Sequence, residues 1–265
     1  MIEFSEIQNS YYILPLVGLI VGIFGTMLGG GGGFFFLPIL TLLIGVPAQT
    51  AVITSLTATL PIGIVGSLAH YHKGNIDFRI GILFALTGIV GAFFGAEITS
   101  RINTDQLKIS FGIYSIAIAL NILWDVWQNK QVEKNEIGQN ELSRFKKNSK
   151  SSFFGFLAGT ITGTFGTSGT APVLAGLLTL HIPLKMVIGT SLLVVLSNTI
   201  FAVGAHFIIG KIDLTLVCFL TAGSIVGALI GPIFLSKIKL NKPENKIRYL
   251  YAFVMVMLGI LMIAK

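Results

Sequence analysis

The stretch that decides the fold is Leu28-Gly29-Gly30-Gly31-Gly32-Gly33-Phe34, in which five consecutive glycines interrupt a long apolar run. Apolar residues lead up to it over positions 12–28 and follow it over positions 34–44. Each glycine destabilises a helix by about 1 kcal/mol relative to alanine. As a helix, the arm after the glycines would be ~16 Å long, roughly half of the ~30 Å hydrocarbon core of a bilayer. We therefore predict a hairpin that turns inside a membrane.

The composition of the 265-residue chain agrees with a membrane location. Hydrophobic residues make up 53% of it and charged residues only 11%, whereas roughly 25% of an ordinary soluble domain is charged. A soluble fold of this length has too little interior to hide so much apolar surface. The composition excludes a soluble enzyme, a nucleic-acid-binding module and a disordered chain, and it predicts an all-α, polytopic membrane protein.

A second broken region and six unbroken runs complete the predicted membrane segments. In the second region, Gly166-Thr167-Ser168-Gly169 separates apolar arms at positions 153–165 and 170–180, so we predict a second hairpin there. Six further apolar runs come close to or exceed the ~20 residues that span a bilayer. They cover positions 50–71, 78–100, 107–127, 186–209, 214–236 and 247–264.

One polar stretch divides the chain into two halves. Positions 128–152 are rich in Lys, Asn, Gln and Ser, a composition typical of a flexible linker. We therefore expect a first membrane repeat at positions 1–127, the linker at positions 128–152, and a second membrane repeat at positions 153–265.

The two halves are related by an internal repeat. A shift of 136 residues aligns positions 47–102 with positions 183–238 without a gap, and 18 of the 56 aligned residues are identical. Thr54-Ser55-Leu56 then falls on Thr190-Ser191-Leu192, and Ala69-His70 falls on Ala205-His206. Internal repeats of this kind are a signature of secondary transporters.

Lysine and arginine indicate how the repeats are oriented. If each broken region returns to the side from which it came, each half makes an odd number of crossings and the second half is inverted. That arrangement places 14 of the 18 Lys and Arg residues on one side, whereas parallel repeats divide them 10 to 8. The positive-inside rule favours the first arrangement. We predict inverted repeats in the cell (inner) membrane, with linker 128–152 in the cytoplasm and both termini outside.

In an inverted pair, the two turns come from opposite faces and meet near the middle of the membrane. The short helices that follow would point their N-termini at a shared space. A helix N-terminus offers free N–H groups and about +0.5 of a charge, and glycine lets a ligand approach the backbone closely. We therefore predict a site for a small anion. The candidate substrate-binding residues are Gly30, Gly31, Gly32, Gly33, Thr54, Ser55, Thr57, Gly166, Thr167, Ser168, Gly169, Thr170, Thr190, Ser191 and Asn198.

These candidates have structural alternatives. Glycine also lets membrane helices pack closely, although packing favours glycine at every fourth position rather than five in a row. The hydroxyls of the two Thr-Ser pairs can instead bond to their own backbone one turn earlier. His70 and His206, which are repeat partners near helix ends, are either proton carriers or partly hydrated interfacial residues.

Several other classes of function lack support in the sequence. It contains no nucleophile-and-base pair, no metal-ligand spacing and no Walker motif, so we expect no enzyme, no metal and no cofactor. Lys and Arg cluster between the apolar runs, where they act as topology signals, so we expect no nucleic-acid partner despite a net charge of +7. The expected partners are a small anionic substrate and the lipid bilayer, and a homo-oligomer stays open.

An ordered set of short motifs extends over about positions 12–264. It comprises glycines 29–33 followed by Phe-Phe-Phe-Leu-Pro38, then Val46-Pro47, Ala51-Val52-Ile53-Thr54-Ser55, His70 with Lys73-Gly74-Asn75-Ile76-Asp77, the glycines at positions 88–95, and Gly189-Thr190-Ser191. Together these motifs resemble the sulfite exporter TauE/SafE family. The second turn departs from the family pattern, because Gly-Thr-Ser-Gly-Thr-Ala-Pro stands where the family usually shows another glycine run.

The resemblance implies export or uptake of sulfur-containing anions such as sulfite and organosulfonates, with the turns and the Thr-Ser pairs lining the path. We therefore expect a membrane transporter that moves a small anion, in the first place a sulfur oxyanion or organosulfonate, by alternating access around a midplane site. An anion channel and a carrier for another small organic anion are the alternatives. Saturable transport with counterflow distinguishes a carrier from a channel.

Overall fold

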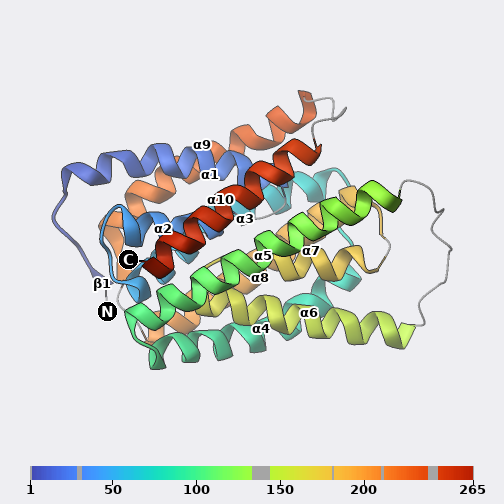
Figure 1. Cartoon of the computed structure of the whole chain (residues 1–265), viewed down its shortest axis with the longest axis horizontal. Helices are drawn as coiled ribbons and strands as arrows, with labels where there is room; N and C mark the ends of the chain where they lie inside the picture. The colour runs from blue at the N-terminus through green and yellow to red at the C-terminus, as the bar shows by residue number, and fades with distance from the viewer. Residues whose placement is uncertain are drawn as a thin grey trace.

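A computed structural model describes residues 2–28, 32–132, 144–180, 182–209, 212–237 and 244–264 (Figure 1). These residues form an all-α membrane protein. Its helices are η1 (Asn9–Ile13), α1 (Leu14–Leu28), α2 (Gly33–Leu42), α3 (Ala48–His72), α4 (Phe78–Arg101), α5 (Thr104–Val132), α6 (Arg144–Phe165), α7 (Thr170–Leu178), α8 (Leu184–Ile209), α9 (Leu214–Lys237) and α10 (Glu244–Ala264).

The helices break at both predicted turns. α1 ends just before the glycine run, and α2 begins at Gly33 after Gly32, which has a φ of 71°. α6 ends at Phe165, and α7 begins after Gly169, which has a φ of 56°. Gly166 has a φ of 64°, so both turns use left-handed backbone that favours glycine.

The second hairpin returns toward the side from which it came. A Cβ added to Gly169 would lie 2.5 Å from Thr162 Oγ1, and one added to Gly176 would lie 2.6 Å from the side chain of Phe154. The contacts therefore move forward along α7 and backward along α6, so the two helices are antiparallel. α7 has 9 residues, or roughly 14 Å at 1.5 Å per residue, which is too short to cross a bilayer.

Glycines bring the first helix of each half against the fourth helix of the other half. A Cβ on Gly91 of α4 would lie 2.7 Å from the backbone nitrogen of Thr160 on α6. The matching pair is α1 on α9, where a Cβ on Gly18 would lie 2.8 Å from the backbone nitrogen of Ser224. These backbones touch directly, which is the packing role that small residues have in membrane helices.

α3 and α8, which correspond to each other in the repeat, cross in opposite directions at the centre of the molecule. A Cβ on Gly63 would lie 3.2 Å from Leu196 Cβ. On Gly66, one turn later in α3, it would lie 3.0 Å from Leu192, one turn earlier in α8. Inverted repeats require this antiparallel relation between corresponding helices, so the contacts support that prediction.

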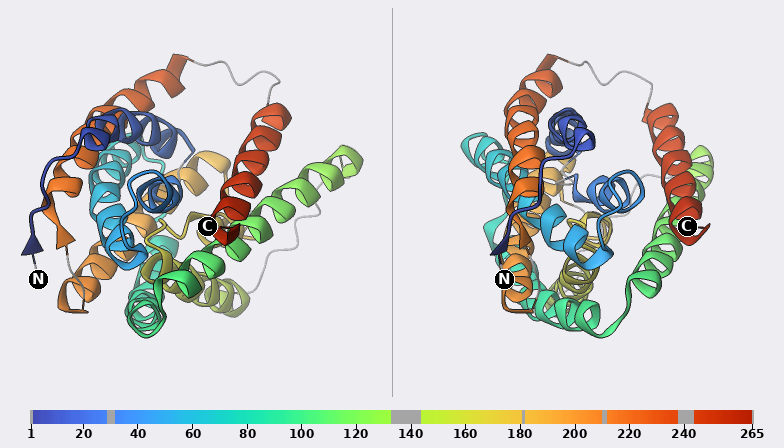
Figure 2. Two further views of the ribbon diagram at one scale, coloured as in Figure 1. Left: turned by 60° about the vertical axis from the view of Figure 1, so that its left-hand side comes forward. Right: turned by 90° about the vertical axis from the view of Figure 1, so that its left-hand side faces the viewer.

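α5 and α10 form a separate flank. The Ser115 hydroxyl donates to the Met255 carbonyl at 2.6 Å and joins the two helices. Figure 2 shows this pair along one side, α1 and α9 along another, and α2 between them. The short helix α2 is therefore surrounded by protein, as non-spanning backbone inside a membrane must be.

The structure differs from the sequence expectations in detail. Among the described residues, six segments are long and apolar enough to cross a membrane. They include Asn9–Thr26, which was expected only as the first arm of a hairpin, whereas Tyr249–Ala264, within the expected run 247–264, is shorter than the six. Helices α5 and α6 extend into both ends of the expected linker 128–152. Within the described residues, a pair of two-residue strands, β1 (Ile2–Glu3) and β2 (Ile212–Asp213), runs in parallel with Ile2 opposite Ile212.

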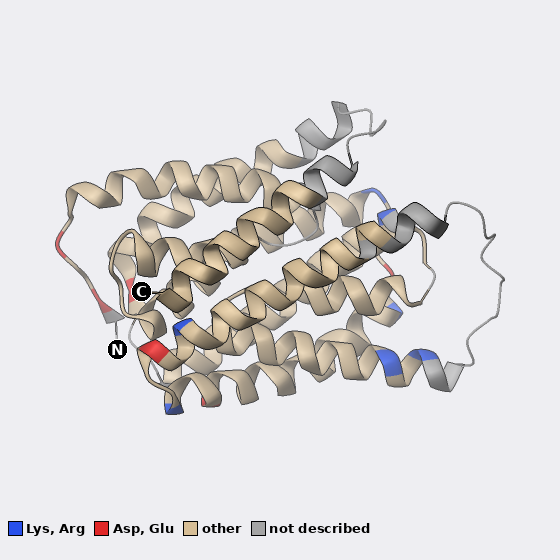
Figure 3. Cartoon of the chain, in the orientation of Figure 1, with Lys and Arg blue, Asp and Glu red and all other residues tan. Residues whose placement is uncertain are grey.

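Charged side chains are distributed unevenly between the two ends of the helices. Lys73, Arg79, Lys147, Lys150 and Lys185 lie at the end of the molecule where α3 finishes, together with Asp77. At the opposite end, Arg101 and Lys108 lie beside Glu97 and Asp105. Figure 3 shows blue segments at both ends of the long axis, with more of them at the end where α6 begins. The positive-inside rule predicts that the more basic end faces the cytoplasm.

Candidate functional site

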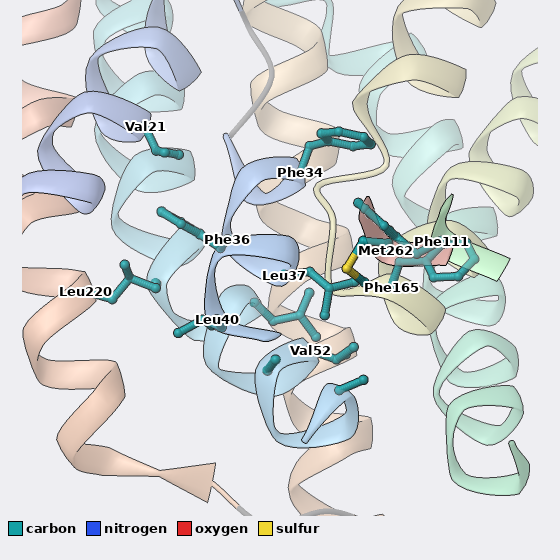
Figure 4. Close-up of a cluster of buried hydrophobic side chains, with 14 of the residues drawn as sticks. Val21, Phe34, Phe36, Leu37, Leu40, Val52, Phe111, Phe165, Leu220 and Met262 are labelled. Atoms are coloured by element: carbon teal, nitrogen blue, oxygen red, sulfur yellow. The ribbon is translucent and has the colours of Figure 1, made fainter. Parts of the chain in front are cut away.

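The two hairpin turns meet inside the protein. A Cβ on Gly33, the first residue of α2, would lie 3.1 Å from the Gly166 carbonyl oxygen and 3.2 Å from the Ser168 nitrogen. Phe34, at the start of α2, and Phe165, at the end of α6, belong to one cluster of buried side chains (Figure 4). The structure therefore brings together the two turns that the sequence separates by more than 130 residues.

Ser55 on α3 joins the two turns. Its hydroxyl lies 3.1 Å from the Gly33 carbonyl oxygen and 2.8 Å from the Gly166 carbonyl oxygen, and the side chain is fully buried. A hydroxyl has one proton, so Ser55 donates to one of these carbonyls at a time. Because α3 rises 1.5 Å per residue, Ser55 lies ~10 Å from the N-terminal end of α3, well inside the helix bundle.

Aromatic rings enclose one side of the meeting point. Tyr114 on α5 stacks on Phe165 with ring centres 5.3 Å apart and an interplanar angle of 19°. Phe34 lies with its ring centre 5.0 Å from that of Phe111. Rings packed in this way exclude water, and they link α5 to both hairpins.

The N-termini of α2 and α7 start at the meeting point without a side-chain cap. Neither Gly32 nor Gly169 provides a capping hydrogen bond, and no acidic residue occurs in the first turn of either helix. Ser168 and Thr170 form a hydroxyl pair at 2.8 Å beside the N-terminus of α7. Two helix N-termini with these hydroxyls produce positive potential and offer hydrogen-bond donors without any charged side chain.

Three of the predicted threonines do not reach the turns through any described contact. Thr54 and Thr57 donate to their own backbone at Thr50 and Ile53, four residues earlier. The Thr190 hydroxyl accepts a hydrogen bond from the Asp77 nitrogen at 2.9 Å, which fixes α8 to the start of α4. Thr54 therefore makes the bond of the structural alternative and Thr57 makes the same kind of bond, whereas Thr190 makes a contact between segments that the sequence did not predict.

Two other predicted residues are buried with polar atoms that lack a partner. Thr167 in the second turn is 2% exposed, and its Oγ1 has no hydrogen bond of acceptable geometry, although the Tyr114 hydroxyl is nearby. Asn198 on α8 is fully buried, and neither Oδ1 nor Nδ2 has a partner among the residues that the structure describes. An unpaired buried polar group is costly, so such groups call for an explanation.

The remaining candidates divide into those at the turns and those beyond the described residues. Gly32, Gly33, Gly166 and Gly169 all lie in the turns. Ser191, the repeat partner of Ser55, is fully buried on α8. Gly30 and Gly31 lie outside the described residues. The turns are packed against each other and against α3, so this conformation is closed at the candidate site.

Sequence reasoning missed two neighbours of the turns. Thr59 has its Oγ1 2.8 Å from the position of an added Cβ on Gly33. Its position four residues after Ser55, on the same face of α3, was a signal that could have found it. Tyr114 carries no comparable signal, because its contact with Phe165 depends on tertiary packing. No cluster of metal ligands occurs among the residues that the structure describes.

Comparison with known proteins identifies relatives. The chain matches the family model for the sulfite exporter TauE/SafE over residues 14–262. It is 30% identical to the probable membrane transporter protein YdhB of Bacillus subtilis, over 84% of this chain and 89% of that protein. It is 29% identical to a probable membrane transporter protein of Methanocaldococcus jannaschii, over 68% of this chain and 66% of that protein.

A further relative is the probable membrane transporter protein YunE of Bacillus subtilis, which is 24% identical over 84% of this chain and 87% of its own length. No solved structure matches the chain significantly. The family match extends over nearly the whole chain and includes both hairpins, α3 and α8. The chain therefore belongs to the sulfite exporter TauE/SafE family of membrane transporters.

Proposed function

We propose that this transporter carries a small anion, in the first place a sulfur oxyanion such as sulfite or an organosulfonate, through a site at the two hairpin turns. The observation that carries the proposal is the meeting of the uncapped N-termini of α2 and α7 beside Ser55. Such termini stabilise negative charge. The sulfur oxyanion follows from the family description, since the geometry alone selects an anion rather than a sulfur atom.

Alternating access is the mechanism that the closed conformation favours. Ser55 holds the two turns together and aromatic rings cover one side of them, so a substrate reaches the turns only after packed helices separate. The pairing of α1 with α9 and of α4 with α6 ties each half to the other in equivalent ways. Rocking of the α1–α9 pair against the α4–α6 pair would open the site to each side of the membrane in turn.

Purified protein in proteoliposomes provides the test. We expect saturable uptake of sulfite, counterflow when the vesicles are preloaded with sulfite, and a dose-dependent rise in the thermal midpoint Tm because a ligand stabilises the state that binds it. Linear uptake without counterflow would favour a channel. If sulfite, organosulfonates and carboxylates all fail to shift Tm or to enter the vesicles, the anion-carrier proposal is wrong.

Substitution of one tip glycine locates the site. Gly33→Val places methyl groups where Thr59 Oγ1 and the Gly166 carbonyl oxygen already lie 2.8 and 3.1 Å from an added Cβ. We expect membrane insertion to persist and sulfite uptake to fall at least about tenfold, which requires the loss of ~1.4 kcal/mol of binding or barrier energy. Gly204→Val on the exposed side of α8 is the matched control, since no atom lies within 4 Å of an added Cβ there.

A further inference from the structure

A buried amide without partners lies where three helices meet. Asn198 on α8 packs over Gly88 of α4, where an added Cβ would come to 3.0 Å from Asn198 Nδ2 and would overlap Oδ1. The Gly88 carbonyl in turn lies directly against Gly159 of α6. We name this meeting point of Gly88, Gly159 and Asn198 the Asn198 junction. Only glycine at position 88 leaves room for the amide.

The repeat does not require an amide at this position. The counterpart of Asn198 in the first half is Ile62, which is fully buried in the apolar core. A leucine or isoleucine at position 198 would fill a similar volume without burying unpaired donors and an acceptor. Asn198 therefore destabilises the closed conformation relative to an apolar residue, and no described hydrogen bond offsets that effect.

The junction lies on the face of α8 that corresponds to the tip-binding face of α3. Ser191 and Asn198 are seven residues apart, so they project from the same side of α8 at a spacing of ~10 Å. Ser191 is the repeat partner of Ser55, which bonds to both turns. On the neighbouring helix α6, Ala158 precedes Gly159 and lies against the second turn, since a Cβ on Gly169 would be 3.0 Å from the Ala158 carbonyl carbon. The Asn198 junction is therefore close to the second turn.

The amide defines the chemistry of its ligand. Nδ2 carries two N–H donors and Oδ1 is an acceptor, so a ligand that satisfies both must present an acceptor oxygen and a proton. A fully deprotonated anion satisfies Nδ2 only and leaves Oδ1 facing negative charge. A monoanion that keeps one acidic proton satisfies both atoms and also brings a proton through a membrane interior that has few carboxylates.

We propose, on the basis of the anion transport proposed above, that Asn198 contacts the substrate and selects monoanions with one acidic proton, such as hydrogensulfite, over fully deprotonated anions of similar shape. Methanesulfonate is the comparison ligand, since a methyl group replaces the acidic proton while the three oxygens remain. The selection is made by Asn198, whereas the helix N-termini at the turns attract either anion.

The test combines affinity with stability. For wild type, Asn198→Leu and Asn198→Ala, the concentration dependence of Tm gives the affinity for hydrogensulfite, at mildly acidic pH, and for methanesulfonate. We expect wild type to prefer hydrogensulfite by about tenfold, the effect of one or two hydrogen bonds. In both variants the preference falls to near unity, while the Tm of unliganded Asn198→Leu stays the same or rises. Thr221→Val, which removes an equally unpartnered hydroxyl on α9, keeps the preference.

Three outcomes overturn the inference. One is an unchanged preference in Asn198→Leu, or in Asn198→Ala if the leucine variant does not insert. Another is that the Asn198 variants have a lower Tm than wild type but the same affinity for both anions, which shows that the amide holds only a buried water and has a structural role. The third is a wild type that binds methanesulfonate as tightly as hydrogensulfite. If neither anion shifts the Tm of wild type, the proposed anion transport itself fails.

Discussion

At the scale of single residues, Ser55 shows how one hydroxyl holds two distant segments together. Thr54 and Ser55 are adjacent and both can donate a hydrogen bond, yet Thr54 bonds to its own helix and Ser55 bonds to the two turns. One residue along a helix is a rotation of ~100°, so neighbours face different surroundings. The residue types were predictable from sequence, but the rotation that separates their roles was not.

Replacement of Ser55 by alanine is expected to loosen the turns. The carbonyls of Gly33 and Gly166 then lose their shared donor inside the protein, which destabilises the closed conformation by about 1–3 kcal/mol. We expect a lower Tm and a smaller fraction of molecules protected from thiol labelling at a cysteine placed in the second turn. Ser224→Ala is the matched control, because the buried Ser224 hydroxyl bonds only to the Leu220 carbonyl of its own helix. Equal changes in both variants would show that Ser55 does not join the turns.

At the scale of helices, the sequence predicts boundaries well where the signals are local. Asp77 directly precedes an apolar run, which is the sequence pattern of a helix cap, and its carboxylate accepts from the Ile80 nitrogen at 3.0 Å at the start of α4. The glycines also placed both helix breaks correctly, because the left-handed backbone at Gly32, Gly166 and Gly169 favours glycine. Helix partners were not predictable, since glycines spaced by four fit equally well against any small-residue surface. The pairing of α4 with α6 needed the structure.

The glycines between helices and the glycines at the turns should respond differently to substitution. A Cβ on Gly91 would lie 2.7 Å from the Thr160 nitrogen, and backbone cannot move aside as a flexible side chain can. Gly91→Val is therefore expected to separate α4 from α6 and to destabilise the protein by about 1–3 kcal/mol. Tm in detergent and the yield of inserted protein measure the loss. Gly204→Val, which meets open space, should leave both unchanged; a stable Gly91→Val protein would contradict the close packing.

At the scale of the whole molecule, the antiparallel crossing of α3 and α8 fits inverted repeats, and the uneven distribution of Lys and Arg predicts which end faces the cytoplasm. Lys147, Lys150 and Lys185 lie at one end of the bundle (Figure 3). Composition alone predicted a membrane protein, because the amount of apolar surface is a property of the whole chain. Whether the two halves are inverted depends on whether each hairpin returns to the side from which it came. For the second hairpin, the return became visible only in the contacts of α6 with α7.

The orientation predicts where two introduced cysteines react. In a Cys218→Ala background, Asn140→Cys is expected to resist an impermeant thiol reagent in intact cells and to react after the membrane is opened. Ser10→Cys, before α1, is expected to react in both conditions because it lies at the end opposite the basic helix starts. Cys218 is exposed on α9, so its replacement by alanine ensures that only the introduced cysteine reacts. If Asn140→Cys but not Ser10→Cys is labelled from outside, the orientation is the reverse of the predicted one. In the inverted arrangement, an odd number of membrane crossings separates the two positions, so they lie on opposite sides. Labelling of both from outside would therefore require parallel halves.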